Sequence, residues 1–146
     1  MNADLHELYQ QAILDHNRRP RNFRAIAGAP NAEGHNPLCG DRVIVYVGVA
    51  DDVVVDAGFQ GSGCAIAMAS ASLMTEAVKG KTVQEVRALF DRLQRMLGTP
   101  PGGPVDQLGA LTALAGVRQF PVRVKCATLP WQALRDALLA NDRDVS

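Results

Sequence analysis

Three cysteines and one aspartate are the side chains of this sequence best suited to chemistry. Cys39, Cys64 and Cys126 each lie in a short segment marked by glycine or by a cation, and Asp41 follows the first thiol by two residues. Three thiolates and a carboxylate form a four-coordinate set that suits zinc, or an iron–sulfur cluster held by one weak ligand. The set predicts metal-linked sulfur chemistry. No Cys-x-x-Cys or His-x-x-x-His spacing is present, which disfavours a zinc finger, and spacing alone does not separate zinc from iron.

Two of the thiols are expected at the starts of helices. Cys64 directly follows the glycine-rich turn 61–63, and Cys126 stands just before the predicted last helix. The N-terminus of a helix stabilises a thiolate, so both cysteines are favourable metal ligands. Arg123 and Lys125 add positive charge beside Cys126 and should favour its thiolate further.

Cys39 has a different setting. It lies between Pro37 and Gly40, in a loop that leads into a predicted strand. His35 precedes it by four residues and could lie next to the ligands without binding the metal. His6 and His16 belong to the opening helix and are expected to be exposed or to cap it rather than to bind metal.

Composition limits the classes of function. The chain of 146 residues is expected to form one domain over 1–146, with 47% apolar residues, as in ordinary globular proteins. Its 15 basic and 15 acidic residues cancel, and it has few aromatic residues, which argues against a nucleic-acid or membrane-surface partner. We find neither a signal sequence nor an apolar run that would span a bilayer, so a cytoplasmic protein with free, metal-binding or reactive thiols is expected.

The apolar pattern predicts a mixed α+β fold. Valine-rich segments at 42–49 and 53–59, joined by two aspartates, predict an antiparallel hairpin, and a third strand is expected around 31–37. Helical spacing predicts the remaining elements at 3–17, 65–80, 83–97, 106–115 and 129–140. Thr82 and Glu85 form a capping box before the third of these helices, and Pro130 is expected in the first turn of the last.

Three longer motifs resemble the IscU/SufU family of iron–sulfur cluster assembly proteins, also called NifU N-terminal-like. They are Asn36-Pro37-Leu38-Cys39-Gly40-Asp41, Gly61-Ser62-Gly63-Cys64-Ala65-Ile66, and the segment Phe120 to Leu129 around Val124-Lys125-Cys126-Ala127. The resemblance extends over nearly the whole chain. It implies a small three-stranded antiparallel sheet packed against about five helices, with downstream iron–sulfur assembly proteins as partners.

Two features resemble the SufU branch more than the IscU branch. Lys125 stands where IscU-type scaffolds carry a histidine before the third cysteine, and the segment between Cys64 and Cys126 is longer than in IscU. The resemblance to SufU implies zinc held at Cys39, Asp41, Cys64 and Cys126. It also implies sulfur acceptance from a SufS-type cysteine desulfurase, which would itself carry the pyridoxal phosphate.

Three functions therefore stand side by side. The first is a zinc-dependent sulfur acceptor and relay, a sulfurtransferase-like partner of the desulfurase rather than a stand-alone enzyme, with the persulfide on Cys39. The second is a scaffold for a [2Fe–2S] cluster bound by Cys39, Cys64 and Cys126. The third is a structural zinc protein that acts as an interaction module. Closed structural zinc sites usually have Cys and His ligands, so Asp41 favours the first two.

Overall fold

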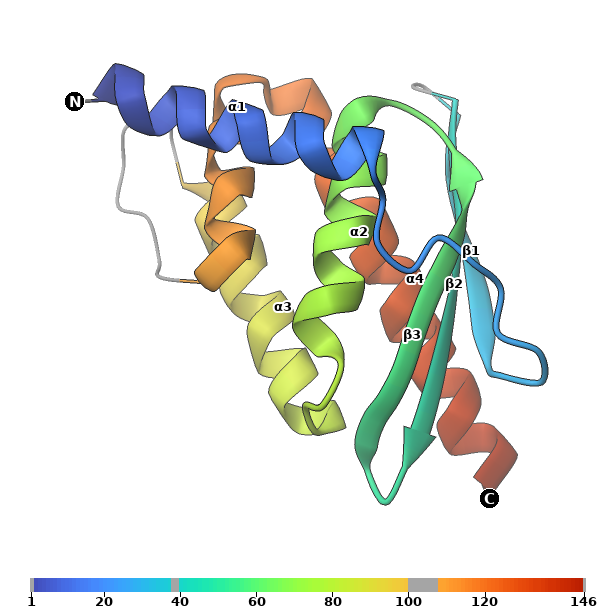
Figure 1. Cartoon of the computed structure of the whole chain (residues 1–146). Helices are drawn as coiled ribbons and strands as arrows, with labels where there is room; N and C mark the ends of the chain where they lie inside the picture. Colours follow the sequence, from blue (N-terminus) through green and yellow to red (C-terminus); the bar gives the residue numbers. More distant parts are fainter. Residues whose placement is uncertain (1, 38–39, 100–107, 146) are drawn as a thin grey trace.

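The computed structural model describes residues 2–37, 40–99 and 108–145. Its elements are α1 (Asn2–Arg18), β1 (Asn31–Asn36), β2 (Asp41–Ala50), β3 (Val53–Ser62), α2 (Ala65–Val78), α3 (Val83–Gly98), the 3₁₀ helix η1 (Gly109–Gln119) and α4 (Pro121–Val145). The predicted α+β class, with three strands and about five helices, is confirmed. Figure 1 shows the helices gathered beside the sheet.

The sheet is an antiparallel meander in the order β1-β2-β3. The predicted hairpin forms at β2 and β3, and Asp51 and Asp52 both adopt positive φ, at 53° and 65°, as the two-residue turn of a hairpin requires. The third strand is confirmed at Asn31–Asn36. Along β2, alternate side chains are fully buried, namely Val43, Val45 and Val47. One face of the sheet therefore belongs to the core.

Helices α2 and α4 pack directly on that face, and α1, α3 and η1 pack outside them. The first half of α2 consists of small residues, which let it approach its neighbours closely. Gly34 of β1 has the same role towards α4, because a Cβ there would lie 3.0 Å from the side chain of Leu129. No helix in the described ranges is both long and apolar enough to span a bilayer.

The last helix begins earlier than predicted. We expected it over 129–140 with Pro130 in its first turn, but α4 starts at Pro121 and Pro130 is an interior residue. Proline at the first position of a helix has the correct φ and needs no N–H partner, so Pro121 is the real start signal. The prediction assigned that signal to the wrong proline.

The expected helix at 106–115 is also corrected. The structure has a 3₁₀ helix at Gly109–Gln119 in its place, while residues 106 and 107 lie outside the described residues. Gly109 opens the element with φ +62°, and buried Leu111, Leu114 and Val117 recur every three residues. A period of three suits the 3.0 residues per turn of a 3₁₀ helix.

His16 is buried, which contradicts the expectation of an exposed or capping residue. Its Nδ1 lies 2.7 Å from the Ser72 hydroxyl of α2, and that hydroxyl also accepts the Arg21 N–H at 2.8 Å. The hydroxyl thus bonds both the Arg21 backbone and the His16 ring, and the other ring nitrogen, Nε2, lies 4.0 Å from the Glu76 carboxylate. This network fastens the end of α1 to α2.

We predict that His16 makes stability fall as pH drops below about 6.5, the pKa of an unperturbed histidine. Burial lowers the pKa of His16, Arg21 lowers it further, and Glu76 and Asp15 oppose the shift. Below pH 6.5 the unfolded chain binds a proton that the folded chain refuses, so acid favours unfolding until the folded pKa is reached. Urea unfolding at pH 7.5 and 5.5 should show a smaller loss of stability in His16→Gln than in the parent protein.

The exposed His35 supplies the control for this measurement. His35→Gln should keep the parental pH dependence. Acid release of a bound metal would affect all three proteins alike. An identical loss in His16→Gln and the parent would contradict the assignment.

Candidate metal centre

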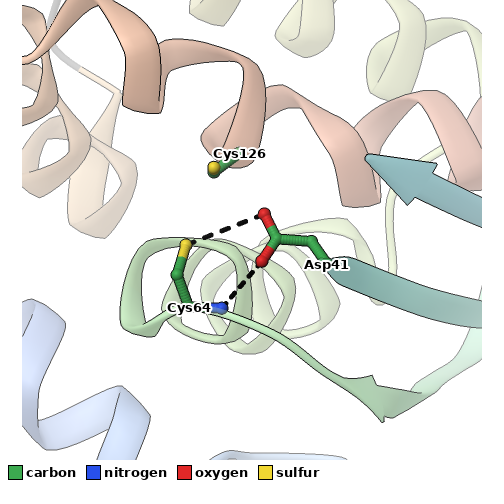
Figure 2. A group of neighbouring side chains, drawn as sticks. All are labelled: Asp41, Cys64 and Cys126. Atoms are coloured by element: carbon green, nitrogen blue, oxygen red, sulfur yellow. Dashed lines mark hydrogen bonds between the residues drawn. The ribbon is translucent and has the colours of Figure 1, made fainter. Parts of the chain in front are cut away.

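Asp41, Cys64 and Cys126 converge from three different elements. Asp41 is the first residue of β2, Cys64 caps α2 and Cys126 belongs to α4. One ligand atom from each lies within 4.8 Å of the other two, and Figure 2 shows the carboxylate and both sulfurs directed towards a common point. Residues far apart in the sequence thus form one compact group of O, S and S donors.

Asp41 is fully buried, which is unusual for a carboxylate. Its Oδ1 accepts the Cys64 backbone N–H at 2.8 Å, and its Oδ2 lies 3.8 Å from the Cys64 thiol (Figure 2). No cationic side chain forms an ion pair with it among the described residues. A buried charge is strongly unfavourable unless it is paired or coordinates a metal. The chemistry of this carboxylate therefore fits a bound cation.

Cys64 stands at the start of a helix, as predicted. It is the N-cap of α2, and its sulfur accepts the Ala67 N–H at 3.4 Å. The sulfur therefore lies at the positive end of the helix dipole, where an anionic metal ligand is favourable. The side chain is partly exposed, so the sulfur is held by the helix yet reachable from outside.

The prediction that Cys126 stands just before the last helix is wrong. Cys126 is the sixth residue of α4, beyond the first turn where the dipole acts. Pro130, four residues later, lacks the N–H that would bond the Cys126 carbonyl in a regular helix. The thiol is fully buried. Cys126 is positioned by packing and by a local irregularity of α4, rather than by a helix terminus.

Gly63 contributes to the site through its lack of a side chain, which sequence reasoning missed. A Cβ at this position would lie 2.6 Å from Asp41 Oδ1 and 3.1 Å from its Cα. Only glycine therefore lets the turn before α2 approach the carboxylate closely enough for the Cys64 N–H to bond it. The glycine-rich turn was recognised, but its contact with Asp41 depends on the third dimension.

Ser70 is a second residue that sequence reasoning missed. It is fully buried on α2, and its hydroxyl donates a 2.5 Å hydrogen bond to the carbonyl of Ala127. Ala127 follows Cys126 directly, so this bond ties the helix that bears Cys64 to the helix that bears Cys126. A serine within a run of alanines was the available signal, because a buried hydroxyl needs a partner.

The observed spacing fits a tetrahedral metal. With bond lengths of about 2.1 Å to oxygen and 2.3 Å to sulfur, ligands of a zinc ion lie about 3.6–3.8 Å apart. The Cys64 sulfur and Asp41 Oδ2 are 3.8 Å apart, and no pair in the group exceeds 4.8 Å. Small side-chain rotations would complete the geometry, and a fourth position is left for another ligand.

The other predicted site residues lie around this group. Cys39 lies outside the described residues. Lys125 and His35 are exposed and line a polar hollow of about 260 Å³ between α4 and β1, and neither belongs to the cluster of ligands. Arg123 is also exposed, in the first turn of α4.

Known proteins are similar to this chain over most of its length. The NifU-like N-terminal domain family matches residues 8–127. The chain is 42% identical to the zinc-dependent sulfurtransferase SufU of Bacillus subtilis, over 97% of this chain and 96% of that protein. It is 39% identical to the iron–sulfur cluster assembly scaffold protein IscU of Streptococcus pyogenes, over 93% of this chain and 86% of that protein.

A solved structure agrees with this similarity. The putative iron–sulfur cluster assembly scaffold protein for the SUF system from Fervidobacterium islandicum superposes with a TM-score of 0.79 at 35% identity. The superposition covers 89% of this chain and 96% of that chain. The chain belongs to the NifU-like N-terminal domain family, and the resemblance stated from the motifs is confirmed.

We predict that Gly63→Ala weakens metal binding, because the added methyl group would displace the Asp41 carboxylate. Zn²⁺ at 100 times its Kd should stabilise the parent protein by about 2.7 kcal/mol, which raises the Tm by roughly 5–10 °C in a chain of this size. The same Zn²⁺ concentration should raise the Tm of Gly63→Ala much less in a thermal unfolding scan.

Gly98→Ala is the matched control, because a Cβ at the end of α3 meets nothing within 4 Å. It should retain the full zinc-dependent rise. Equal rises in Gly63→Ala and the parent protein would contradict the role of Gly63.

Proposed function

We propose that this member of the NifU-like N-terminal domain family is a zinc-dependent sulfur acceptor and relay in iron–sulfur cluster assembly. It would take persulfide sulfur from a SufS-type cysteine desulfurase and pass it to downstream assembly proteins. The observation that carries the proposal is the convergence of Asp41, Cys64 and Cys126, with a third thiol two residues before the aspartate.

Covalent geometry supports Cys39 as the fourth ligand. A single residue, Gly40, separates Cys39 from Asp41, so their Cα atoms cannot be more than about 7 Å apart. Gly40 has φ +71°, a conformation that favours glycine, at the entry to β2. Bound zinc would supply the positive charge that keeps the three thiols deprotonated at neutral pH.

The way the other two thiols are held supports Cys39 as the acceptor. Cys126 is fully buried in α4 and Cys64 caps α2, so moving either sulfur would disturb a packed helix. Cys39 belongs to the short connection between β1 and β2. Its thiolate would attack the outer sulfur of the persulfide on the desulfurase cysteine. The donor S–S bond breaks, the donor cysteine leaves as a thiolate, and a new S–S bond forms on Cys39 with no net oxidation.

The surface beside Cys64 supports a protein donor. An apolar hollow of about 230 Å³ includes Ala65 and Ile66, the two residues after Cys64, together with Leu14 and Phe120. Leu14 and Phe120 are 40% and 56% exposed, and nearby Val122 is 72% exposed. Apolar patches of this kind are typical of protein interaction sites. We place the desulfurase contact here, and the protein in the cytoplasm, where thiols stay reduced.

A [2Fe–2S] scaffold is the second candidate, because relatives are named as scaffolds and the same thiols would bind the cluster. Metal analysis distinguishes the two. Colourless purified protein with about one zinc ion supports the relay, whereas brown protein with iron and sulfide supports the scaffold. A purely structural zinc module would hold zinc but leave the turnover of the desulfurase unchanged.

We predict that sulfur from the desulfurase accumulates on Cys39. After incubation with desulfurase and free cysteine, alkylation and peptide mass analysis should find the additional sulfur mainly on the Cys39 peptide. Cys39→Ser should abolish acceptance and the stimulation of desulfurase turnover while circular dichroism shows an intact fold. Persulfide found mainly on Cys64 or Cys126, with Cys39 unmodified, would reject the assignment.

Lys125 is proposed to adjust the reactivity of the thiols without binding metal, together with Arg123. An ammonium group cannot coordinate until it loses its proton, whereas its charge favours a nearby thiolate. Lys125→Gln should therefore keep its zinc stoichiometry yet accept sulfur several-fold more slowly. Lys81→Gln, which removes a charge near the end of α2, is the control and should leave the rate unchanged. Loss of zinc from folded Lys125→Gln would show that the role is wrongly assigned.

A further inference from the structure

Two of the candidate metal ligands are also thiols that lie close enough to react with each other. The sulfurs of Cys64 and Cys126 are within 4.8 Å of one another, and neither takes part in a disulfide. Figure 2 shows the two sulfurs directed towards the same point from α2 and α4. A disulfide bond is about 2.05 Å long. A change of rotamer moves a cysteine sulfur by roughly 3 Å, which is the order of movement that a bond between them needs.

The two thiols differ in their access to solvent. Cys64 is partly exposed at the N-cap of α2, whereas Cys126 is fully buried within α4. A small oxidant from solution would therefore meet Cys64 before Cys126. An accessible cysteine with a second thiol beside it is the arrangement of redox-sensing sites, because the second thiol converts the first oxidation product into a disulfide.

We propose that Cys64 is a site of modification by hydrogen peroxide and that Cys126 is its resolving thiol. The Cys64 thiolate attacks one peroxide oxygen, the O–O bond breaks and hydroxide leaves, so that Cys64 becomes a sulfenic acid. The Cys126 thiolate then attacks the Cys64 sulfur, a second hydroxide leaves and the S–S bond forms. The two sulfurs together lose two electrons, and the peroxide gains them.

This modification would inactivate the candidate metal centre. The disulfide takes away two of its three described ligands and leaves only the Asp41 carboxylate among them. Because a thiolate is the form that binds metal, bound zinc is released when both sulfurs are oxidised. The proposal concerns the regulation of the centre and rests on the proposed function for one consequence, that oxidation stops sulfur transfer. A dithiol reductant restores both thiols and the ability to bind zinc.

Peptide mapping tests the proposal directly. Zinc-loaded protein is treated with hydrogen peroxide while a chromogenic chelator records the release of zinc. The remaining thiols are alkylated, and the peptides are analysed by mass spectrometry without reduction. We expect a linked pair of peptides that contain Cys64 and Cys126, formed at the rate of zinc release. Dithiothreitol should separate the pair and return both thiols.

Two variants that each lack one thiol sharpen the test. In Cys126→Ser no resolving thiol is present, so the Cys64 peptide should gain two or three oxygen atoms, which dithiothreitol does not remove. Cys39→Ser is the matched control, because it lacks a thiol that the proposed disulfide does not use. It should form the Cys64–Cys126 disulfide as the parent does. Circular dichroism checks the fold of both variants, and the maps of the parent and Cys39→Ser decide the matter if Cys126→Ser does not fold.

Three results would overturn the inference. One is that Cys64 and Cys126 both remain reduced after peroxide has released the zinc. Another is a disulfide that joins Cys39 to either of them in place of the proposed pair. The third is oxidation of Cys64 beyond the sulfenic acid in the parent protein as fast as in Cys126→Ser. Failure of the untreated protein to accept sulfur would count against the proposed function alone, because peptide mapping does not use the desulfurase.

Discussion

The buried carboxylate of Asp41 is the constraint around which the rest of the molecule is organised. It lies at the first residue of β2, fully removed from water, and accepts the backbone N–H of the residue that caps α2. That single 2.8 Å bond joins the sheet to the helix that covers it. A carboxylate in this position destabilises the fold unless a cation compensates it. The start of β2 and the start of α2 are therefore mutually dependent, and a cation bound at this carboxylate would stabilise both.

Close packing of small residues makes this arrangement possible. Gly63 lets the turn before α2 reach the carboxylate, and Ser70 connects α2 to α4 beside Cys126. On the far side of α4, Gly34 allows Leu129 to lie against β1. Each contact brings two backbones closer than larger side chains would permit. The distances between the ligands are thus determined by helix packing, because no two of the three described ligands share an element.

Two regions of the helical layer differ in chemistry. One region carries the candidate metal ligands and the exposed apolar residues beside Cys64, which suit contact with another protein. The hollow between α3 and α4 is lined instead by the stacked rings of Phe90 and Trp131 and by charged residues of both signs. Between them, the His16–Ser72 contact fastens α1 across α2.

Much of this could be predicted from the sequence, because the signals are local. The alternation of valines predicts β2, and the paired aspartates predict the turn between β2 and β3. The capping box of Thr82 and Glu85 predicts the start of α3. The grouping of Asp41, Cys64 and Cys126 could also be predicted, since thiols and a carboxylate together suit a metal ion. Family membership followed from the same motifs.

Other features were decided by the tertiary structure alone. Pro121 and Pro130 are both compatible with a first helical turn, and only packing against the sheet and α2 selects Pro121 and puts Cys126 inside the helix. His16 looks like a surface residue of α1 until Ser72, 56 positions away, covers it. The contact of Gly63 with Asp41 likewise joins the turn before α2 to the start of β2. Residue types and short-range patterns are properties of the chain, whereas burial and ligand distances arise when segments remote in sequence exclude water between them.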